Sequence, residues 1–475
     1  MILKERKWHI LIALALGTIM VPINTSIVNV ALPFISSGFN TNLSSLDWVI
    51  TSYLITLVGL VLFFGRLGDM YGHEKVYLSG LIFFIFTSIL CSFSSSIIYL
   101  ILSRALQGIA AAMMISVSLG MVKKVFPPYE LGKALGLYAV AIAAGLAIGP
   151  AIGGILIGFF GWRSIFLPNV PIGIISFIIC LFVLKRGTGE KVKWDIPGTI
   201  LQFTTLFLII LFLNRIENGL FDILEILLMI LVLVLFSLFI LRERTAENPL
   251  IDLSLFTNYT FSAFSLALFF NYICMYMVIF VLPFYLQKVL HYGPAITGLT
   301  LTVSPLLMMI IAPFSGFLGD RIGSRPLVFL GSLISALAFY LMTWLTMFSS
   351  IYIVIGFLSI LGIGAAIFQA PNNRAIMISI PEKSAGVASS ILVTMRNLGM
   401  IFAVSFASLL ISTTISKTIL ESQVLYNLDS YNFTQGLHLV ALLGTFLSIL
   451  MALLSIWGSR RLKQVKPIMK GIITD

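Results

Sequence analysis

Charge is scarce in this sequence. Only 10% of its 475 residues are charged, whereas soluble domains carry about 25%. Apolar residues make up 59% of the chain, and its mean hydropathy is +1.08. Apolar runs near or above the roughly 20 residues that a helix needs to cross a bilayer recur along the whole length. This composition excludes an ordinary soluble domain and predicts an all-α polytopic membrane protein.

Side chains that bind metals or act in catalysis are also rare within the predicted spans. The three cysteines, Cys91, Cys180 and Cys274, all fall inside apolar runs, so they predict neither a disulfide framework nor a metal site. The four histidines lie at the ends of the predicted spans or in loops. No Asp or Glu falls in the interior of predicted spans 1–6 or 9–14. An enzyme embedded in the membrane would need such groups, so we predict no enzyme, no cofactor and no metal.

Fourteen membrane spans can be drawn along the chain. Their approximate ranges are 9–33, 47–65, 76–95, 97–122, 132–158, 165–185, 196–214, 219–241, 258–286, 295–318, 326–348, 350–372, 384–413 and 435–458. If both termini are cytoplasmic, 23 of the 29 Lys and Arg residues lie inside and four outside, as the positive-inside rule requires. Arg104 and Arg396 lie within spans. We therefore expect a protein of the cell membrane with cytoplasmic termini, and the net charge of +11 indicates no nucleic-acid partner.

One loop motif occurs twice. Residues 65–72 and 316–323 both read Gly-x-Leu-Gly-Asp-x-x-Gly, 251 positions apart. Internal repeats are typical of secondary transporters, and they indicate two equivalent halves. The sequence predicts a six-helix bundle over 1–188, an inserted hairpin of spans 7 and 8 over 189–248, and a second six-helix bundle over 249–475.

These motifs carry a family resemblance. The repeated loop resembles the loop between the second and third helices of the major facilitator superfamily. The stretch Gly145–Gly154, which reads Gly-x-x-x-Gly-Pro-x-x-Gly-Gly, is similar to the motif of its exporters, and Arg104–Gly108 is similar to its second motif. The stretches Asn24–Pro33 and Trp162–Gly173 resemble the fourteen-helix drug:proton antiporter family.

The resemblance implies a gating role for the repeated loop. Asp69 would accept hydrogen bonds from the start of span 13 at Pro381–Ser384, and Asp320 would face the start of span 5, because helix N-termini attract anions. The alternative is a tight turn that needs glycine for backbone freedom. Further candidates for coupling or gating are Arg104, Gly149, Pro150 and, as proton carrier, Asp47. For Arg104 the alternative is a purely structural arginine held by backbone carbonyls, and for the glycines ordinary small-residue packing.

The sequence departs from relatives that export cations. Many of these carry aspartate at the position of Asn24, and some at that of Thr51, but both residues are neutral here. No buried negative charge is then available to attract a cation, so we expect a neutral or anionic amphiphile with Arg104 or Arg396 as counter-charge. The expected cavity is lined by spans 1, 2, 4, 5, 9, 10, 12 and 13. Candidate substrate-binding residues are Asn24, Asn29, Gln107, Asn271, Gln369, Asn372, Asn373 and Arg396.

The sequence thus predicts a secondary active exporter that works by alternating access, with protons as the coupling ion. An uptake symporter or facilitator of the same fold is the alternative. Its expected partners are a small-molecule substrate, protons and the lipid bilayer, and we expect a monomer.

Overall fold

A computed structural model describes residues 2–41, 43–184, 195–217, 223–246, 253–380, 385–415 and 427–458. Helices account for nearly all of these residues, and the described part of the chain contains no strand. The helices of the first half are α1 (Ile2–Thr18), α2 (Met20–Phe39), α3 (Leu43–Tyr71), α4 (His73–Ser92), α5 (Ile97–Val125), α6 (Pro128–Phe160), η1 (Trp162–Phe166) and α7 (Asn169–Val183). Then follow α8 (Ile196–Glu217) and α9 (Ile223–Thr245). The second half consists of η2 (Leu253–Thr257), α10 (Tyr259–Phe284), η3 (Tyr285–Val289), α11 (Pro294–Ile322), α12 (Ser324–Met342), α13 (Ile351–Ile378), α14 (Ala385–Ser412) and α16 (Asn427–Trp457).

The prediction of fourteen spans is confirmed, because fourteen segments of the described chain are long and apolar enough to cross a membrane. The first span, Lys7–Phe39, runs through α1 and α2 with only Ile19 between them. The ninth, Tyr259–Val289, continues from α10 into the π-helical turn η3. In a bilayer each helix satisfies its own backbone hydrogen bonds, which explains why long apolar runs form helices here.

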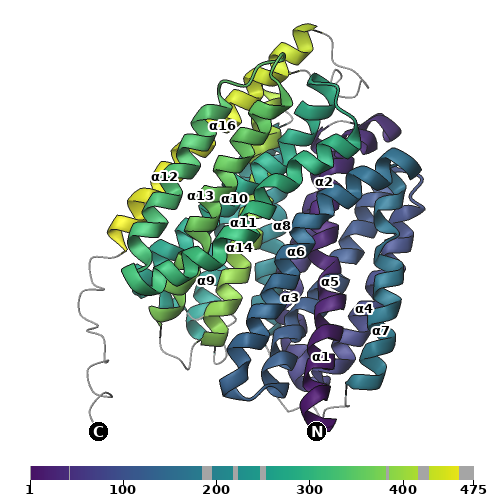
Figure 1. Ribbon diagram of the computed structural model, residues 1–475, viewed down its shortest axis with the longest axis vertical. Helices are drawn as coiled ribbons and strands as arrows, with labels where there is room; N and C mark the ends of the chain where they lie inside the picture. Colours follow the sequence, from purple (N-terminus) through teal and green to yellow (C-terminus); the bar gives the residue numbers. More distant parts are fainter. Residues whose placement is uncertain are drawn as a thin grey trace.

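The two halves have matching internal packing. In the first half α5 packs against α3 and α4, and in the second half α13 packs against α11 and α12. Small residues allow these close contacts at matching places. A Cβ atom on Gly80 would lie 3.1 Å from the backbone oxygen of Ala110, and one on Gly331 would lie 2.7 Å from that of Gly364. Figure 1 shows the first half in purple and blue and the second in green and yellow.

Each copy of the repeated loop motif forms the turn between two helices. Gly72 joins α3 to α4 with a φ of +102°, and Gly323 joins α11 to α12 with a φ of +89°. Residues other than glycine rarely adopt this left-handed backbone conformation. The glycine that ends each motif is therefore required by the turn itself, whatever else the motif does.

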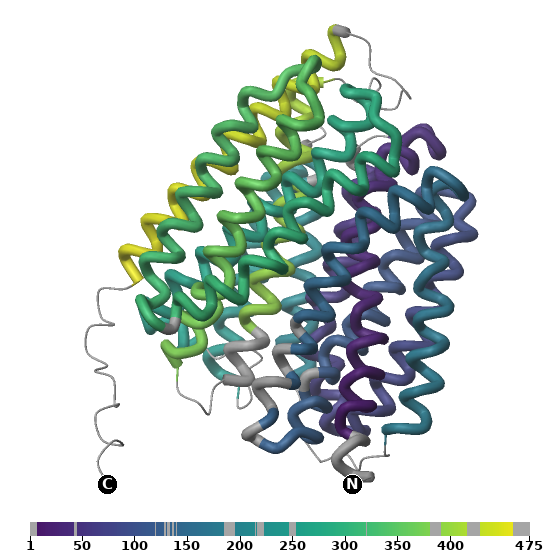
Figure 2. Tube along the Cα trace, viewed as in Figure 1, coloured from purple at the N-terminus to yellow at the C-terminus, as the bar shows by residue number. Residues whose placement is uncertain are grey.

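Three helix pairs make the most extensive contacts between the halves. α6 packs against α11, α2 packs against α10, and α3 packs against α14. We call the end of the bundle where α1 begins the near end, and the opposite end the far end. Figure 2 follows the same chain from purple to yellow and shows α1 running from the near end into the bundle between the neighbouring helices.

The hairpin of α8 and α9 covers the contact between α3 and α14. α8 packs against both α3 and α14, whereas α9 packs mainly against α8. A Cβ atom on Gly59 of α3 would lie 2.5 Å from the Phe203 ring, so α8 sits close against this helix. Only 11% of the apolar window of α9 is buried, which fits contact with lipid.

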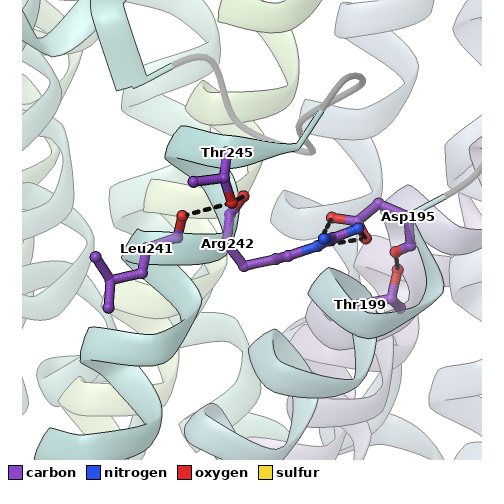
Figure 3. Close-up of polar contacts among 5 residues, drawn as sticks. All are labelled: Asp195, Thr199, Leu241, Arg242 and Thr245. Atoms are coloured by element: carbon purple, nitrogen blue, oxygen red, sulfur yellow. Dashed lines mark hydrogen bonds and ion pairs between the residues drawn. The ribbon is translucent and has the colours of Figure 1, made fainter.

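An ion pair closes each end of the hairpin. At the near end, Arg242 Nε and Nη2 both donate to Asp195 Oδ1, at 3.0 and 2.8 Å (Figure 3). At the far end, Arg215 Nε donates to Glu225 Oε1 at 2.8 Å. Because both carboxylates are buried, each is neutralised by an arginine of the same helical hairpin. These pairs join α8 and α9 into one unit.

Removing the near-end arginine should loosen that end. We expect Arg242→Ala to speed amide hydrogen exchange severalfold in the last turn of α9 and the first turn of α8, because Asp195 loses its bidentate partner. Transport should remain largely intact. The matched control is Arg244→Ala, which removes an exposed arginine from the same turn and should change nothing. Equal exchange in the two variants would show that the pair contributes nothing to the hairpin.

Candidate functional site

The glycine-rich stretch of α6 has two contact faces. Gly145, Gly149 and Gly153, each four residues apart, lie against α2: Cβ atoms there would lie within 3.0 Å of Ile19, Ser26 and Ile27 respectively. Because these three glycines have no side chains, the backbone of α6 approaches the backbone of α2, a helix of the same half.

The second face of the same stretch meets the opposite half. A Cβ atom on Gly154 would lie 2.3 Å from the backbone oxygen of Pro294 in α11. One on Gly298 of α11 would lie 2.1 Å from the backbone oxygen of Pro150. Of the residues predicted for gating, Pro150 thus lies at a crossing where the two halves touch backbone to backbone, whereas Gly149 faces α2 of its own half.

Two hydrogen bonds also join the halves. The hydroxyl of Tyr276 in α10 donates to the backbone oxygen of Thr25 in α2 at 3.1 Å. Gln287 Nε2 donates to the backbone oxygen of Val30 at 3.1 Å. Gln287 lies beyond α10 in η3, next to the far-end start of α11, so these contacts and the α6–α11 crossing hold the halves together from mid-span to the far end.

A cavity of about 210 Å³ lies on the other side of these contacts, towards the near end. Its walls come from α1, α2, α3, α5 and α6 of the first half and from α14 of the second. These are predicted spans 1, 2, 4, 5 and 13. The lining residues are Thr18, Val21, Pro22, Thr25, Leu54, Leu57, Ile115, Ser118, Tyr138, Ile142, Leu146, Val393, Arg396, Asn397 and Met400. Arg396 is the one charged side chain among these described residues.

The lining hydroxyls are bonded within the wall. Thr25 Oγ1 donates to the backbone oxygen of Val21 at 2.8 Å, and Ser118 Oγ donates to that of Ile115 at 3.0 Å. Because the Ser118 hydrogen is used in this way, the hydroxyl of Tyr138, 2.7 Å from Ser118 Oγ, acts as the donor between the two. The hydroxyls therefore offer few free donors to a ligand.

A buried polar cluster holds the arginine of α5. Arg104 is 1% exposed; its Nε donates to the backbone oxygen of Val49 at 3.1 Å and its Nη1 to Gln107 Oε1 at 2.7 Å. Its guanidinium carbon lies 4.3 Å from the centre of the Tyr53 ring. Gln107 Nε2 donates to Ser88 Oγ at 2.8 Å. Backbone and ring contacts of this kind are those expected of a purely structural arginine. The coupling role of Arg104 stays a prediction.

Gln107 is itself a predicted substrate-binding residue, and two others, Asn24 and Asn29, lie in or beside this cluster. Asn24 Nδ2 donates to Gln107 Oε1 at 3.0 Å, and Asn29 Nδ2 donates to the backbone oxygen of Thr25 at 2.8 Å. Both asparagines are fully buried. Neither they nor Gln107 lie on the wall of the cavity.

Two of the predicted residues of the second half bond groups of that same half. Gln369 Nε2 donates to the hydroxyl of Tyr272 at 2.5 Å, and Asn372 Nδ2 donates to the backbone oxygen of Phe264 at 3.1 Å. Asn271 is 1% exposed, and Asn373 is half-buried. Of all the residues predicted to bind substrate, Arg396 is the one that lines the cavity. The others stay predictions, placed in the bundle interior.

The acidic candidates lie in three different settings. Asp47 is fully buried near the start of α3. Asp69 Oδ1 lies 3.3 Å from His73 Nε2 across the turn between α3 and α4, and its side chain is 40% exposed. The side chain of Asp320 and the expected partner segment Pro381–Ser384 lie outside the described residues.

Asn397 is a cavity residue that the sequence analysis missed, as it missed the lining hydroxyls of Thr25, Ser118 and Tyr138. Asn397 is 5% exposed, follows Arg396 directly in α14, and lines the same wall. Within the described part of the chain, neither Asn397 Nδ2 nor Arg396 Nε has a hydrogen-bond partner. The sequence does show two adjacent polar residues in predicted span 13, but it led us to predict only the arginine as a substrate-binding residue.

Comparisons with known proteins agree with this architecture. The family model of the Major Facilitator Superfamily matches residues 14–404. The chain is 37% identical over 408 residues to "Riboflavin transporter RibZ" of Clostridioides difficile (strain 630), covering 85% of this chain and 88% of the relative. It is 30% identical over 392 residues to "Tetracenomycin C resistance and export protein" of Streptomyces glaucescens, covering 82% and 73%.

Solved structures with a similar fold are also transporters. A bacterial homologue of the human lysosomal transporter Spinster, in an inward-facing and unoccupied conformation, superposes with a TM-score of 0.68 at 15% identity, covering 96% of this chain and 97% of that one. The peptide transporter POT in complex with sulfate gives a TM-score of 0.70 at 12% identity, covering 95% of both chains. At this identity the likeness concerns the fold alone.

Proposed function

This chain belongs to the major facilitator superfamily, and from that premise we propose that it moves small neutral or anionic amphiphiles across the cell membrane by alternating access. That it is a membrane transporter of a small molecule, and no enzyme, follows from the family and its relatives. The proposal for the substrate class rests on the cavity, whose described lining includes the cation Arg396 and no acidic side chain. An apolar wall with a few polar groups is typical of sites for small amphiphiles.

For the direction of transport we propose export by proton antiport, with the protein acting as a monomer and both termini cytoplasmic. Support comes from the exporter-like stretch of α6 at the crossing of the halves, and from relatives that include a resistance and export protein. On this orientation the cavity opens from the cytoplasmic half of the membrane while the far-end contacts are closed. The residues proposed for coupling are Arg104 and Asp47.

Transport of riboflavin is a second candidate. One observation favours it, namely the 37% identity to a riboflavin transporter over most of both chains. Riboflavin is a flat, neutral heterocycle. It needs no acidic group as a partner, so it is compatible with a cavity wall whose described residues include none. It could be moved in either direction, so the alternative of an uptake symporter or facilitator is kept with it.

Transport by purified protein in proteoliposomes tests both candidates. The probes are riboflavin, the anionic dye 1-anilinonaphthalene-8-sulfonate and the cationic dye ethidium, each with and without an imposed pH gradient. We expect gradient-dependent movement of the neutral or anionic probes and little of ethidium. Riboflavin movement without a gradient would identify a facilitator, and movement of ethidium alone would contradict the proposed substrate class.

We also propose that Asp69 closes the near end by capping α14. Asp69→Asn should lower transport severalfold, because an amide attracts the positive end of a helix less than a carboxylate does. A cysteine introduced at Ser384 should react faster with a polar thiol reagent in this variant. The background is low, since the three native cysteines are buried. Asp69→Glu, which keeps the charge, is the control. Normal transport and unchanged reactivity in Asp69→Asn would leave Asp69 as a turn residue.

A further inference from the structure

Two hydrogen-bond donors on the cavity wall lie next to each other in the chain. Arg396 Nε and Asn397 Nδ2 are both buried, both come from α14, and both have no partner within the described residues. Buried polar groups are usually paired in proteins, and of the described residues that carry an unpaired one, only Arg396 and Asn397 line the cavity. A ligand that accepts hydrogen bonds from both atoms would satisfy them.

The rest of the wall restricts what such a ligand can be. The hydroxyls of Thr25 and Ser118 donate to carbonyls of their own helices, so they compete little with α14 as donors. Most other lining side chains are aliphatic and come from the first half, and Val393 and Met400 flank the donors on α14. The described wall thus combines an apolar surface with donors at one side and lacks a carboxylate.

We propose that Arg396 and Asn397 form a donor pair that recognises the acceptor edge of an amphiphilic substrate. The acceptor edge is a pair of neighbouring oxygens, which either a carboxylate or the carbonyl groups of a neutral ring can supply. The inference rests on the proposed function and extends it, because it names the substrate group and adds Asn397 as a specificity-determining residue.

The position of the pair also links binding to the two halves. The donors belong to α14 of the second half, whereas the apolar wall belongs mainly to α2, α3, α5 and α6 of the first. A bound ligand therefore contacts both halves at once. A substrate lacking the acceptor edge would leave the donors unsatisfied and would be rejected, as sites built for hydrogen bonds reject analogues that lack the partner group.

Binding to the full chain purified in detergent tests the pair separately from transport. The probes are 2-naphthoate, riboflavin and the cation 2-naphthylmethylammonium, and affinities are taken from ligand-dependent thermal shifts. We expect the parent to bind naphthoate or riboflavin at least about tenfold more tightly than the cation, since a hydrogen bond to a charged group contributes this much or more. Preference for naphthoate identifies a carboxylate as the acceptor edge, and preference for riboflavin identifies ring carbonyls.

Asn397→Asp is the decisive variant, because it keeps the shape of the side chain and replaces the donor by an acceptor. It should weaken binding of the preferred probe about tenfold or more. Arg396→Lys, which keeps the charge but loses Nε, should weaken it as well. The matched control is Asn169→Asp, the same change at a buried asparagine of α7 away from the cavity, which should retain parental affinity. If Asn397→Asp does not fold, Asn397→Leu removes the donor without adding charge.

Either of two results would overturn the inference: parental affinity in the folded Asn397 variant, or a parent that binds neither acceptor probe more tightly than the cation. These outcomes are distinct from failure of the proposed function. Binding that depends on Asn397 without any transport would contradict only the proposed function. Transport of riboflavin that is indifferent to Asn397 would contradict only the donor pair.

Discussion

Gly298→Ala is expected to abolish transport although it adds a single methyl group. The new Cβ atom would lie 2.1 Å from the backbone oxygen of Pro150 and 3.1 Å from the Cα atom of Gly154. Both are backbone atoms of a helix in the opposite half, so no rotation of a side chain relieves the clash. The halves must separate at this crossing, and overpacking of this kind destabilises by about 1–3 kcal/mol or more. We expect a lower melting temperature together with transport near background in proteoliposomes.

The matched control is Gly356→Ala. Gly356 lies inside α13, and a Cβ atom there would meet nothing within 4 Å. The same substitution should leave transport unchanged and stabilise the helix by up to about 1 kcal/mol, because alanine is the better helix former. If Gly298→Ala transported as well as Gly356→Ala, the close crossing of α6 and α11 would not be part of the transport cycle.

Arg104→Ala is expected to have an effect of similar size for a different reason. The guanidinium is almost fully buried, bonds the Val49 carbonyl and Gln107, and stacks on Tyr53. Its removal takes a charged donor from two buried acceptors, although Asn24 Nδ2 still donates to Gln107 Oε1. Each lost hydrogen bond from a charged group costs about 1.5–3 kcal/mol. The substitution also leaves a cavity between α3 and α5. We expect loss of transport and a strong fall in melting temperature. Arg104→Lys should restore only part of the transport and of the melting temperature, since an ammonium group cannot reproduce the planar, forked donors of a guanidinium.

Arg163→Ala is the matched control for this change. Arg163 also donates to a backbone carbonyl, that of Ser94 at 3.0 Å, and its guanidinium carbon lies 4.4 Å from the centre of the Trp162 ring. However, Arg163 is exposed, so water can replace it as a donor. Its removal should change stability by less than about 1 kcal/mol. Equal effects of the two substitutions would show that burial of Arg104 is not what makes it important.

Most of the fold was predictable from the sequence because the membrane leaves the backbone few choices. A lipid-exposed segment must satisfy its own hydrogen bonds, so each long apolar run becomes a helix. The repeated loop was equally readable, since Gly72 and Gly323 occupy the left-handed region that the turn requires. The short junction between α1 and α2 and the π-helical η3 lie inside apolar runs, and hydropathy carries no signal for them.

The site was less predictable, because the direction of a polar side chain depends on how its helix is rotated in the bundle. Asn24 and Gln107, which are predicted to bind substrate, bond each other beside Arg104 and lie off the cavity wall. In α14 both members of an adjacent pair line the cavity, although only Arg396 was chosen from the sequence. Uniformly apolar helices have no polar face to reveal their rotation, so a single polar residue gives no direction.

The position of the hairpin has a consequence for the order in which the protein is assembled. Chains fold from the N-terminus during synthesis. α3 and α8 are made well before α14, yet α8 packs against both. The hairpin, with an ion pair at each end, can therefore dock on α3 while the second half is still being translated. A nascent first half would then present α14 with a binding surface to which α8 already contributes.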